Sequence, residues 1–273
     1  MPPLTICVMS RKGGTGKTTN ALNLAGSFVN DGLRVACLDL DGQGSLSRCL
    51  LGPARVESMH PANTTAGLFD PKYDPTPDDL IQPTRFDRLF VVPSSDALET
   101  FNRPSPAEAG EAQFVIRRFL DEAANRIDLA VIDTGPNTSG LLGWAALAAS
   151  DFVLTPILPD PFGSHAIIHV QRLVEESQVK VNPKLRIAGY LLNMVQKNAV
   201  QQAYEQTLRQ IHGGQVFTTV VPLLAPYREA IAERAPVTLL KPKVKASKVV
   251  KAVAEELEAR ITAAIGTTKK EVA

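Results

Sequence analysis

Short apolar stretches alternate with longer amphipathic stretches along most of the chain, the pattern of strands that alternate with helices. The apolar stretches predict strands over residues 4–9, 33–38, 86–92, 128–133, 152–157, 185–193 and 216–221. Strands joined by helices in this way usually form a parallel sheet with both faces covered. We therefore expect a single α/β domain with a mostly parallel, twisted sheet of about seven or eight strands and helices on both faces.

The amphipathic stretches predict the helices between these strands. Apolar spacing of the helical type covers residues 21–29, 108–125, 141–149, the segment after Pro161 and a final helix to about Ile265. Residues 52–83 are rich in Pro, Asp and Thr, and they predict only short helices and loops. The domain is expected to span residues 1–265, followed by a polar C-terminal tail over residues 266–273.

Composition limits the classes of protein to consider. The chain has 273 residues, of which 44% are hydrophobic, and a net charge of +1. This is enough for one sizeable core, and any contact with nucleic acid must come from a local basic patch. The longest apolar run, near residues 141–149, is too short for a membrane span, and Met1-Pro2-Pro3 leaves no room for a signal peptide. Cys7, Cys37 and Cys49 are widely spaced, and we expect buried, reduced thiols in a cytoplasmic protein.

A glycine-rich segment follows the first predicted strand. Residues 10–20 read S-R-K-G-G-T-G-K-T-T-N, and a helix is predicted immediately after them. Glycines in such a turn let backbone N–H groups converge on an anion, and the helix N-terminus adds positive charge. Lys17 is then expected to reach the terminal phosphates of a nucleotide, and the Thr18 hydroxyl to coordinate Mg²⁺. The candidate ATP-binding residues of the loop are Lys12, Gly13, Gly14, Thr15, Gly16, Lys17, Thr18 and Thr19.

The loop differs from the general phosphate-binding pattern at one position. Arg11 stands where G-x-x-x-x-G-K-T requires glycine, and Lys12 gives the loop a second lysine. The resulting sequence, K-G-G-T-G-K-T-T, is the deviant Walker A motif, and with it the chain resembles the ParA/MinD family of cargo-positioning ATPases. The resemblance implies that Lys12 reaches across a dimer interface to the nucleotide of a second subunit.

A pair of acidic residues ends the second predicted strand. The segment from Asp39 reads D-L-D-G-Q-G, and the family's second signature is D-x-D-P-Q-G, so that Gly42 replaces the usual proline. By resemblance Asp41 orients the attacking water and lies near the Mg²⁺ shell, while Asp39 supports the loop. Phosphoryl transfer requires mainly positioning and charge stabilisation, which a lysine and a water-orienting carboxylate can supply. A solvated turn is the alternative interpretation.

A further acidic residue, Asp133, ends the strand over residues 128–133, the expected Walker B position. Asp133 is expected to hold Mg²⁺ through a water, and residues 134–136 to sense the γ-phosphate. Family members often read D-x-P-P here, and Gly135 departs from that pattern. An aspartate that caps the following helix is the alternative interpretation.

The second half of the chain contains weaker signals. In related ATPases an Asn at the end of the strand that corresponds to residues 185–193 recognises adenine, and Asn193 is the candidate here. An Asn that ends the strand without any role in binding is an equally good interpretation. Pro222 and the loop to Arg228 lie where the family closes over the base. His165 and His169 are four residues apart on a predicted helix, but without a third ligand they favour an ordinary helix over a metal site.

The segment before the last helix is basic. Lys241, Lys243, Lys245 and Lys248, with Arg228, are candidate contacts to DNA phosphates, and a solvated loop is the alternative. The last helix places Val250, Val253, Leu257 and Ile261 on one stripe beside several glutamates. A membrane-surface helix prefers a lysine-rich polar face. We therefore expect this helix to pack on the domain, and no membrane contact.

Together the motifs and the resemblance predict a ParA-like, Mg²⁺-dependent ATPase that converts ATP and water to ADP and phosphate. The resemblance implies a homodimer in the ATP-bound state, non-specific binding to DNA, and hydrolysis stimulated by a ParB-like or other cargo adaptor. Such a cycle positions a plasmid, a chromosome or a protein assembly over the nucleoid. The alternatives are a MinD-like membrane-associated ATPase and a biosynthetic ATP-dependent enzyme on the same fold. The latter would require a substrate domain or cluster-binding cysteines, and neither is visible.

Overall fold

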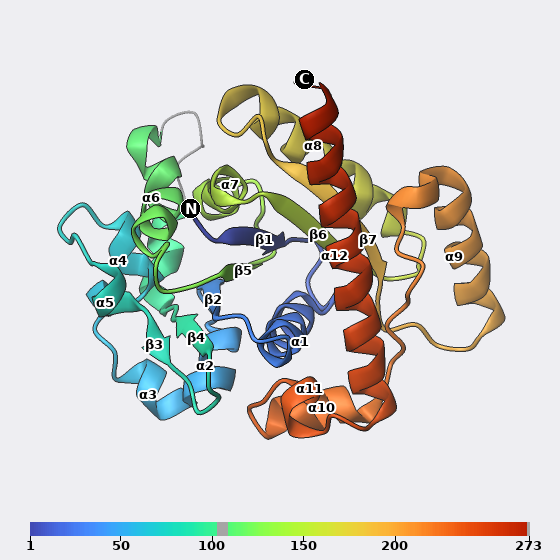
Figure 1. Ribbon diagram of the computed structural model, residues 1–273, viewed down its shortest axis with the longest axis horizontal. Coiled ribbons are helices and arrows are strands. Elements are labelled where there is room, and N and C mark those ends of the chain that lie inside the picture. The colour runs from blue at the N-terminus through green and yellow to red at the C-terminus, as the bar shows by residue number, and fades with distance from the viewer. Residues whose placement is uncertain (103–108, 272–273) are drawn as a thin grey trace.

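A sheet of seven strands forms the centre of the computed structural model, in the order β3-β4-β2-β5-β1-β6-β7 (Figure 1). The structure describes residues 1–102 and 109–271, with only the backbone of residues 267–271. The strands are β1 (Leu4–Val8), β2 (Val35–Leu40), β3 (Gln82–Pro83), β4 (Leu89–Val92), β5 (Leu129–Thr134), β6 (Phe152–Ile157) and β7 (Arg186–Leu192). Neighbouring strands are parallel except β3 and β4. The predicted α/β class and the mostly parallel sheet are confirmed.

Helices cover both faces of the sheet (Figure 1). One face carries α1 (Lys17–Asn30), α2 (Ser45–Leu51), α10 (Ala225–Ala232), α11 (Val237–Leu240) and α12 (Lys245–Glu271). The other carries α4 (Thr65–Phe69), α5 (Pro77–Leu80), α6 (Val115–Glu122), α7 (Leu141–Ala149) and α8 (Gly163–Lys180). The 3-10 helices η2 (Asp96–Phe101) and η4 (Gly110–Phe114) add apolar side chains to this second layer. Outside the two layers lie α3 (Pro53–Glu57), α9 (Ala199–His212) and the 3-10 helices η1 (Pro61–Asn63) and η5 (Gly213–Gln215).

The strands divide the core into two layers because successive side chains of a strand point to opposite faces. In β1, Ile6 and Val8 belong to the layer under α1 and α12, whereas Cys7 belongs to the layer under α7. The three cysteines are buried and free, as expected for reduced thiols. The apolar stripe of α12, from Val250 to Ile261, is buried in the first layer, so the prediction that this helix packs on the domain is confirmed.

Several element boundaries differ from the sequence prediction. The helix predicted over 108–125 begins as the 3-10 helix η4 and is α-helical only over α6; residue 108 lies outside the described residues. Strand β4 begins at Leu89, because Arg88 has a φ of +60° that a strand cannot accommodate. The last helix continues past residue 265 to Glu271, into the segment expected to be a polar tail.

The prediction of a strand over residues 216–221 was wrong. Phe217 and Val221 donate hydrogen bonds to carbonyl groups of β7, at 2.9 and 2.8 Å. Between them, the N–H groups of Thr218 and Thr219 each donate at 2.8 Å to the carboxylate of Glu256 on α12. The segment therefore contacts the edge strand β7 through isolated bridges. The Glu256 carboxylate accepts the N–H groups of Thr218 and Thr219, which a continuous strand would direct to its neighbouring strand or to solvent.

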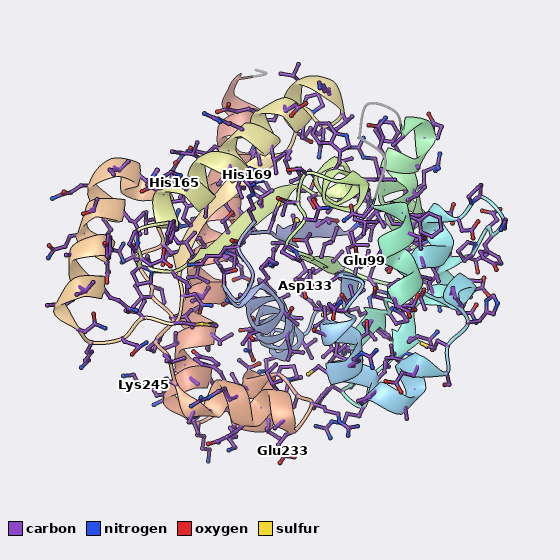
Figure 2. The ribbon with its side chains drawn as sticks, turned by 180° about the vertical axis from the view of Figure 1, so that it is seen from behind. Glu99, Asp133, His165, His169, Glu233 and Lys245 are labelled. Carbon is purple, nitrogen blue, oxygen red and sulfur yellow. The ribbon has the colours of Figure 1, made fainter. Side chains whose placement is uncertain are left out.

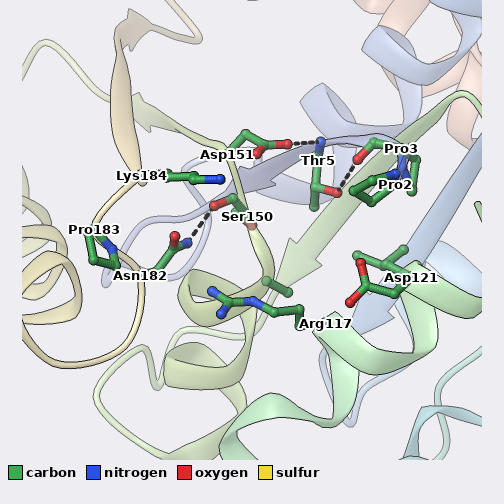
Figure 3. A pocket seen from close by; sticks show the side chains of 12 residues that line it. Pro2, Pro3, Thr5, Arg117, Asp121, Ser150, Asp151, Asn182, Pro183 and Lys184 are labelled. Carbon is green, nitrogen blue, oxygen red and sulfur yellow. Dashed lines mark hydrogen bonds between the residues drawn. The ribbon is translucent and has the colours of Figure 1, made fainter. Parts of the chain in front are cut away.

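The amino ends of β1, β6 and β7 frame a polar cavity of about 350 Å³ (Figure 3). In it, the Asp151 carboxylate accepts a hydrogen bond of 2.8 Å from the Thr5 N–H group, and Asn182 Nδ2 donates to the Ser150 carbonyl at 2.7 Å. Burial raises the pKa of Asp151. These bonds join the starts of the strands at the edge of the sheet opposite the glycine-rich loop, which follows the carboxyl end of β1.

The contact between Glu256 and residues 218–219 gives a first prediction. Hydrogen bonds from both N–H groups and from Arg260 outweigh burial and lower the pKa of Glu256. Glu256→Ala should leave two donors without their acceptor and decrease the free energy of unfolding by about 2 kcal/mol, measured by urea denaturation. The control is Glu255→Ala. The Glu255 carboxylate is exposed, and its ion pair with Lys251 is long, at 3.8 Å, so this substitution should change stability little. Equal effects of the two substitutions would contradict the assignment.

Candidate nucleotide site

The loop between β1 and α1 has the conformation of a phosphate cradle. Gly14 and Gly16 have φ values of +73° and +85°, in the left-handed region that favours glycine. Gly16 is also closely packed, since a Cβ there would lie 2.3 Å from Asn193 Nδ2. Helix α1 begins at Lys17 with no side-chain cap and no acidic residue in its first turn. Its first N–H groups and the positive end of its dipole are therefore available to an anion.

The loop lysine of the general motif is buried in this cradle. Only 7% of Lys17 is exposed, and its ammonium group donates to the Lys12 carbonyl oxygen at 3.5 Å. Burial lowers the pKa of Lys17, while the carboxylates of Asp133 and Asp41 act in the opposite direction. A partly desolvated cation beside the loop has the position required to neutralise bound phosphates.

The two aspartates that end β2 have different environments. Asp39 is fully buried and accepts hydrogen bonds from Ser47 N (2.8 Å) and Ser47 Oγ (2.7 Å) at the start of α2. Burial raises the pKa of Asp39 to about 6. Asp41 is partly exposed, and its Oδ1 accepts from the Gln43 N–H group at 3.0 Å. Asp39 is thus engaged in holding the loop, whereas Asp41 has a carboxylate that solvent and ligand can reach.

Asp133 ends β5 in register with Asp39 on β2. It is fully buried, inside the molecule in Figure 2, and neither of its carboxylate oxygens accepts a hydrogen bond of ordinary length and angle. Burial and the charge of Asp39 raise the pKa of Asp133 well above its ordinary value; Thr18 and Lys17 act in the opposite direction. A buried carboxylate without a partner is costly, and a hydrated divalent cation would remove that cost. Thr18, Asp41 and Asp133 therefore fit the Mg²⁺ site that the motifs imply.

The two departures from the family pattern have different structural settings. A Cβ at Gly42 would lie 2.4 Å from Cγ of Glu99, a residue of η2 that the sequence analysis did not single out. Glycine at position 42 therefore makes room for a further acidic side chain next to Asp41. At Gly135 a Cβ would meet the Asp41 carboxylate at 3.6 Å, an ordinary contact distance, so space does not explain that glycine. The preceding Thr134 joins β5 to β1 through a 3.1 Å hydrogen bond to the Val8 carbonyl.

The second lysine of the loop points out of the cradle. Lys12 Nζ forms an ion pair of 2.6 Å with Asp160 and lies 5.4 Å from the centre of the Phe162 ring. The Lys12 side chain is 42% exposed, and Phe162 is 63% exposed. Sequence reasoning missed both partners, which belong to the P-D-P-F turn between β6 and α8. Within one chain, the Lys12 ammonium is thus held at the surface beside the phosphate loop.

Helix α8 also contacts the loop that follows Asp133. The ring of His169 shares a hydrogen bond of 2.9 Å with the buried Thr138 hydroxyl, and burial and the nearby Arg11 and Arg172 lower its pKa. His165 is exposed on the same helix (Figure 2). Across residues 1–102 and 109–271, no group of three or more His, Cys, Asp or Glu side chains could hold a metal ion. The metal interpretation of the histidine pair is therefore unsupported.

A pocket of about 440 Å³ adjoins the loop, and it brings together residues far apart in the sequence. Thr19, Asn193, Pro222 and Arg228 line it, with apolar walls from Val221, Leu224, Tyr227, Ile231 and Val250. Asn193 is 3% exposed, and its Nδ2 donates to the Thr15 carbonyl at 2.6 Å. Such a pocket can hold a flat heteroaromatic ring, and Asn193 has the added role of fixing the phosphate loop.

The basic residues predicted to contact DNA lie near this pocket. Lys241 is ion-paired with Glu229 at 2.6 Å, and this ion pair makes its ammonium group less available to a DNA phosphate. Arg228, Lys243, Lys245 and Lys248 are exposed, and Figure 2 shows Lys245 at the edge of the molecule.

Comparisons with known proteins agree with this site. A family model described as an AAA domain matches residues 4–187. The chromosome partitioning protein ParA of Myxococcus xanthus is 29% identical over 94% of this chain and 88% of its own length. The sporulation initiation inhibitor protein Soj of Bacillus subtilis is 28% identical over 93% of this chain and 98% of its own length. The chain belongs to the ParA/MinD family of P-loop ATPases.

Solved structures share the fold of this ATPase. Apo McdA from Cyanothece has a TM-score of 0.79 at 20% identity and covers 93% of this chain and 99% of its own. Cobyrinic acid a,c-diamide synthase from Mycobacterium smegmatis, with bound ADP and magnesium, has a TM-score of 0.75 at 19% identity, with 93% of each chain covered. The cell division ATPase MinD from Pyrococcus furiosus has a TM-score of 0.70 at 23% identity and covers 94% of this chain and 98% of its own.

The buried carboxylate of Asp133 gives a second prediction. Asp133→Asn should leave the unfolding free energy of the nucleotide-free protein unchanged or higher, because a buried charge is removed. The same substitution should abolish most of the stabilisation by ATP with Mg²⁺, which for the wild type is about 2.7 kcal/mol at a ligand concentration of one hundred times Kd. Thermal unfolding with and without nucleotide measures both. Asp128→Asn, at the other end of β5 and ion-paired with Arg34, is the control and should retain the effect of nucleotide. If ATP with Mg²⁺ stabilises the Asp133→Asn variant as much as the wild type, the Mg²⁺ assignment is contradicted.

Proposed function

We propose that this protein is a positioning ATPase that binds ATP with Mg²⁺, dimerises in that state and binds DNA non-specifically. Hydrolysis, stimulated by a ParB-like or other cargo adaptor, returns it to monomers and moves a plasmid, a chromosome or a protein assembly over the nucleoid of the cytoplasm. The observation that carries the proposal is the location of Lys12. A second lysine in a phosphate loop, held at the surface by one exposed ion pair, is available to a nucleotide bound by another copy of the chain.

The residues of the site divide the work of hydrolysis. Bound Mg²⁺ would add positive charge beside the terminal phosphates, and Thr18, Asp41 and Asp133 are the residues that would hold it. The N–H groups of the loop and the Lys17 ammonium bind the phosphates of ATP, and Asn193 and Pro222 line the pocket for its base. We assign the Asp41 carboxylate, which is partly exposed next to Gly135, the role of orienting the attacking water. This is the positioning and charge stabilisation that phosphoryl transfer requires.

Two structural observations weigh against the alternative functions. A MinD-like protein would need a free amphipathic helix, but the apolar stripe of α12 is buried, and no helix among the described residues is long and apolar enough to cross a membrane. A biosynthetic enzyme would need a substrate pocket beside the phosphate loop. The pocket found there is the apolar one that suits the nucleotide base. Turnover of ATP that depends on an added small molecule would favour the biosynthetic alternative.

The role of Lys12 can be tested by substitution. Lys12→Ala should abolish ATP-dependent dimerisation on a sizing column and with it ATP-dependent binding to DNA, because it removes a charge that neutralises phosphate across the interface. Asp160→Asn is the matched control: it removes the intramolecular partner and leaves the amine, so dimerisation should persist or strengthen. A Lys12→Ala protein that still dimerises with ATP would refute the proposal.

The role of Asp41 gives a separate prediction. Asp41→Ala should decrease kcat for ATP hydrolysis by about 10²-fold or more, because water is no longer oriented. The phosphate contacts remain, so the variant should accumulate as an ATP-bound dimer. Glu99→Ala, which removes the neighbouring acidic side chain, is the comparison and should retain most of the turnover. Undiminished turnover of the Asp41 variant, measured by phosphate release, would contradict the assignment.

A further inference from the structure

Three arginines that are far apart in the sequence line one cavity on the surface. Arg55 comes from α3, Arg85 follows β3, and Arg234 follows α10; the cavity measures about 430 Å³. The remaining lining residues are Leu50, Leu51, Gly52, Pro83 and Thr84, none of them acidic. The cavity shares no residue with the phosphate loop or the base pocket. We call it the arginine pocket.

Within the part of the chain that the structure describes, no acidic side chain pairs with these arginines. Arg85 donates to the carbonyl oxygens of Glu233 and Arg234, and Arg55 donates to Gln82 Oε1 at 2.8 Å. All these acceptors are neutral. Among the residues that the structure describes, none of the three arginines lies within 4.0 Å of a carboxylate oxygen, whereas Arg48, Arg118 and Arg126 each have an acidic partner.

The backbone around the pocket is shaped to bring Arg234 close. Arg234 itself has a φ of +54°, an unfavourable value for a residue with a side chain. Gly52, opposite, has a φ of +88°, and a Cβ there would lie 2.8 Å from Arg234 Nη1. The guanidinium group of Arg234 thus packs directly against the Gly52 backbone. The positive field of Arg85 and Arg234 reaches the buried Cys49, where it partly offsets the effect of burial on the thiol pKa.

We propose that the arginine pocket binds a phosphate group, and that this group is a backbone phosphate when the protein is on DNA. Guanidinium groups held by neutral acceptors keep their charge and their forked donors, which suit the oxygens of a phosphate. The second part of the proposal rests on the proposed function.

The position of the pocket fits a duplex. The elements that supply the arginines, α3, β3 and α10, lie toward the same edge of the molecule as α11 and the start of α12 (Figure 1). Figure 2 shows Glu233, next to Arg234, and Lys245 along this edge. The pocket would extend the row formed by Lys243, Lys245 and Lys248, so that one backbone could contact both parts. Three exposed acids lie close in sequence to the pocket arginines: Glu57, Asp87 and Glu233. Glu57 is paired with Arg48, and Asp87 with Arg88.

The experiment compares two double variants. Arg55→Gln with Arg234→Gln empties the pocket of two charges, while Arg85, which tethers residues 233–234, is kept. Arg118→Gln with Arg126→Gln removes two exposed arginines that already have acidic partners. Binding to a short labelled duplex is measured by fluorescence anisotropy with a non-hydrolysable ATP analogue, over a range of salt concentrations. Basal ATP turnover, which uses none of these residues, reports the integrity of the fold.

The pocket variant should bind the duplex at least about tenfold more weakly, and its log–log salt dependence should be shallower by about 0.9 for each DNA phosphate that it no longer neutralises. The control variant should behave like the wild type. A second arm measures binding of tripolyphosphate by calorimetry to protein saturated with ADP and Mg²⁺. If only the pocket variant fails to bind tripolyphosphate while its duplex binding is unchanged, the phosphate pocket is supported and its ligand is a free polyphosphate.

Unchanged binding of both duplex and tripolyphosphate in the pocket variant would overturn the proposal. Failure of the proposed function is distinguishable, since then the wild-type protein itself would not bind the duplex with the ATP analogue. The tripolyphosphate arm would still decide whether the arginines form a phosphate site.

Discussion

The nucleotide site depends on the buried carboxylate of Asp133. It lies at the end of a central strand without a hydrogen bond, next to a second buried aspartate, Asp39, and near the Lys17 ammonium. Ser47 satisfies Asp39 at the start of α2, whereas Asp133 accepts no hydrogen bond of ordinary length and angle, although the nearby Thr18 and Lys17 act to lower its pKa. A chain selected for stability alone would avoid this arrangement, because a buried unpaired charge is costly. Under the proposed function, a cation and a phosphate would complete the site.

Unlike the buried Asp133 carboxylate, the ion pair of Lys12 with Asp160 lies at the surface. It is short but exposed, and exposed ion pairs contribute only about 0–1 kcal/mol. Lys12 can therefore leave Asp160 at little cost when a more strongly charged group, such as the phosphates of a neighbouring nucleotide, approaches. The Phe162 ring beside the amine is also largely exposed, so this part of the surface offers both charge and apolar area to a second molecule.

Helix α12 connects the nucleotide region to the rest of the fold. Its apolar stripe closes one core layer, Val250 lines the base pocket, and Lys245 and Lys248 lie in its first turn on the surface. Glu256 and Arg260 hold the segment that follows α9 against the edge of β7. One helix thus contributes to the core, the base pocket and the proposed DNA surface.

The alternating strands and helices, the phosphate loop and the acids at the strand ends could be predicted from the sequence, because these features depend on local periodicity and on short motifs. Parallel strands then bring their carboxyl ends together, so the nearness of Asp41, Asp133 and Lys17 could be expected. The three-dimensional structure was needed to show that residues 216–221 are not a strand, because Glu256, which is distant in sequence, accepts hydrogen bonds from Thr218 and Thr219. It alone placed Asp160 beside Lys12, Glu99 beside Gly42, and Arg55, Arg85 and Arg234 in one pocket. These pairings join segments whose separation in the chain carries no periodic signal, and they arise from how loops pack once the sheet has formed.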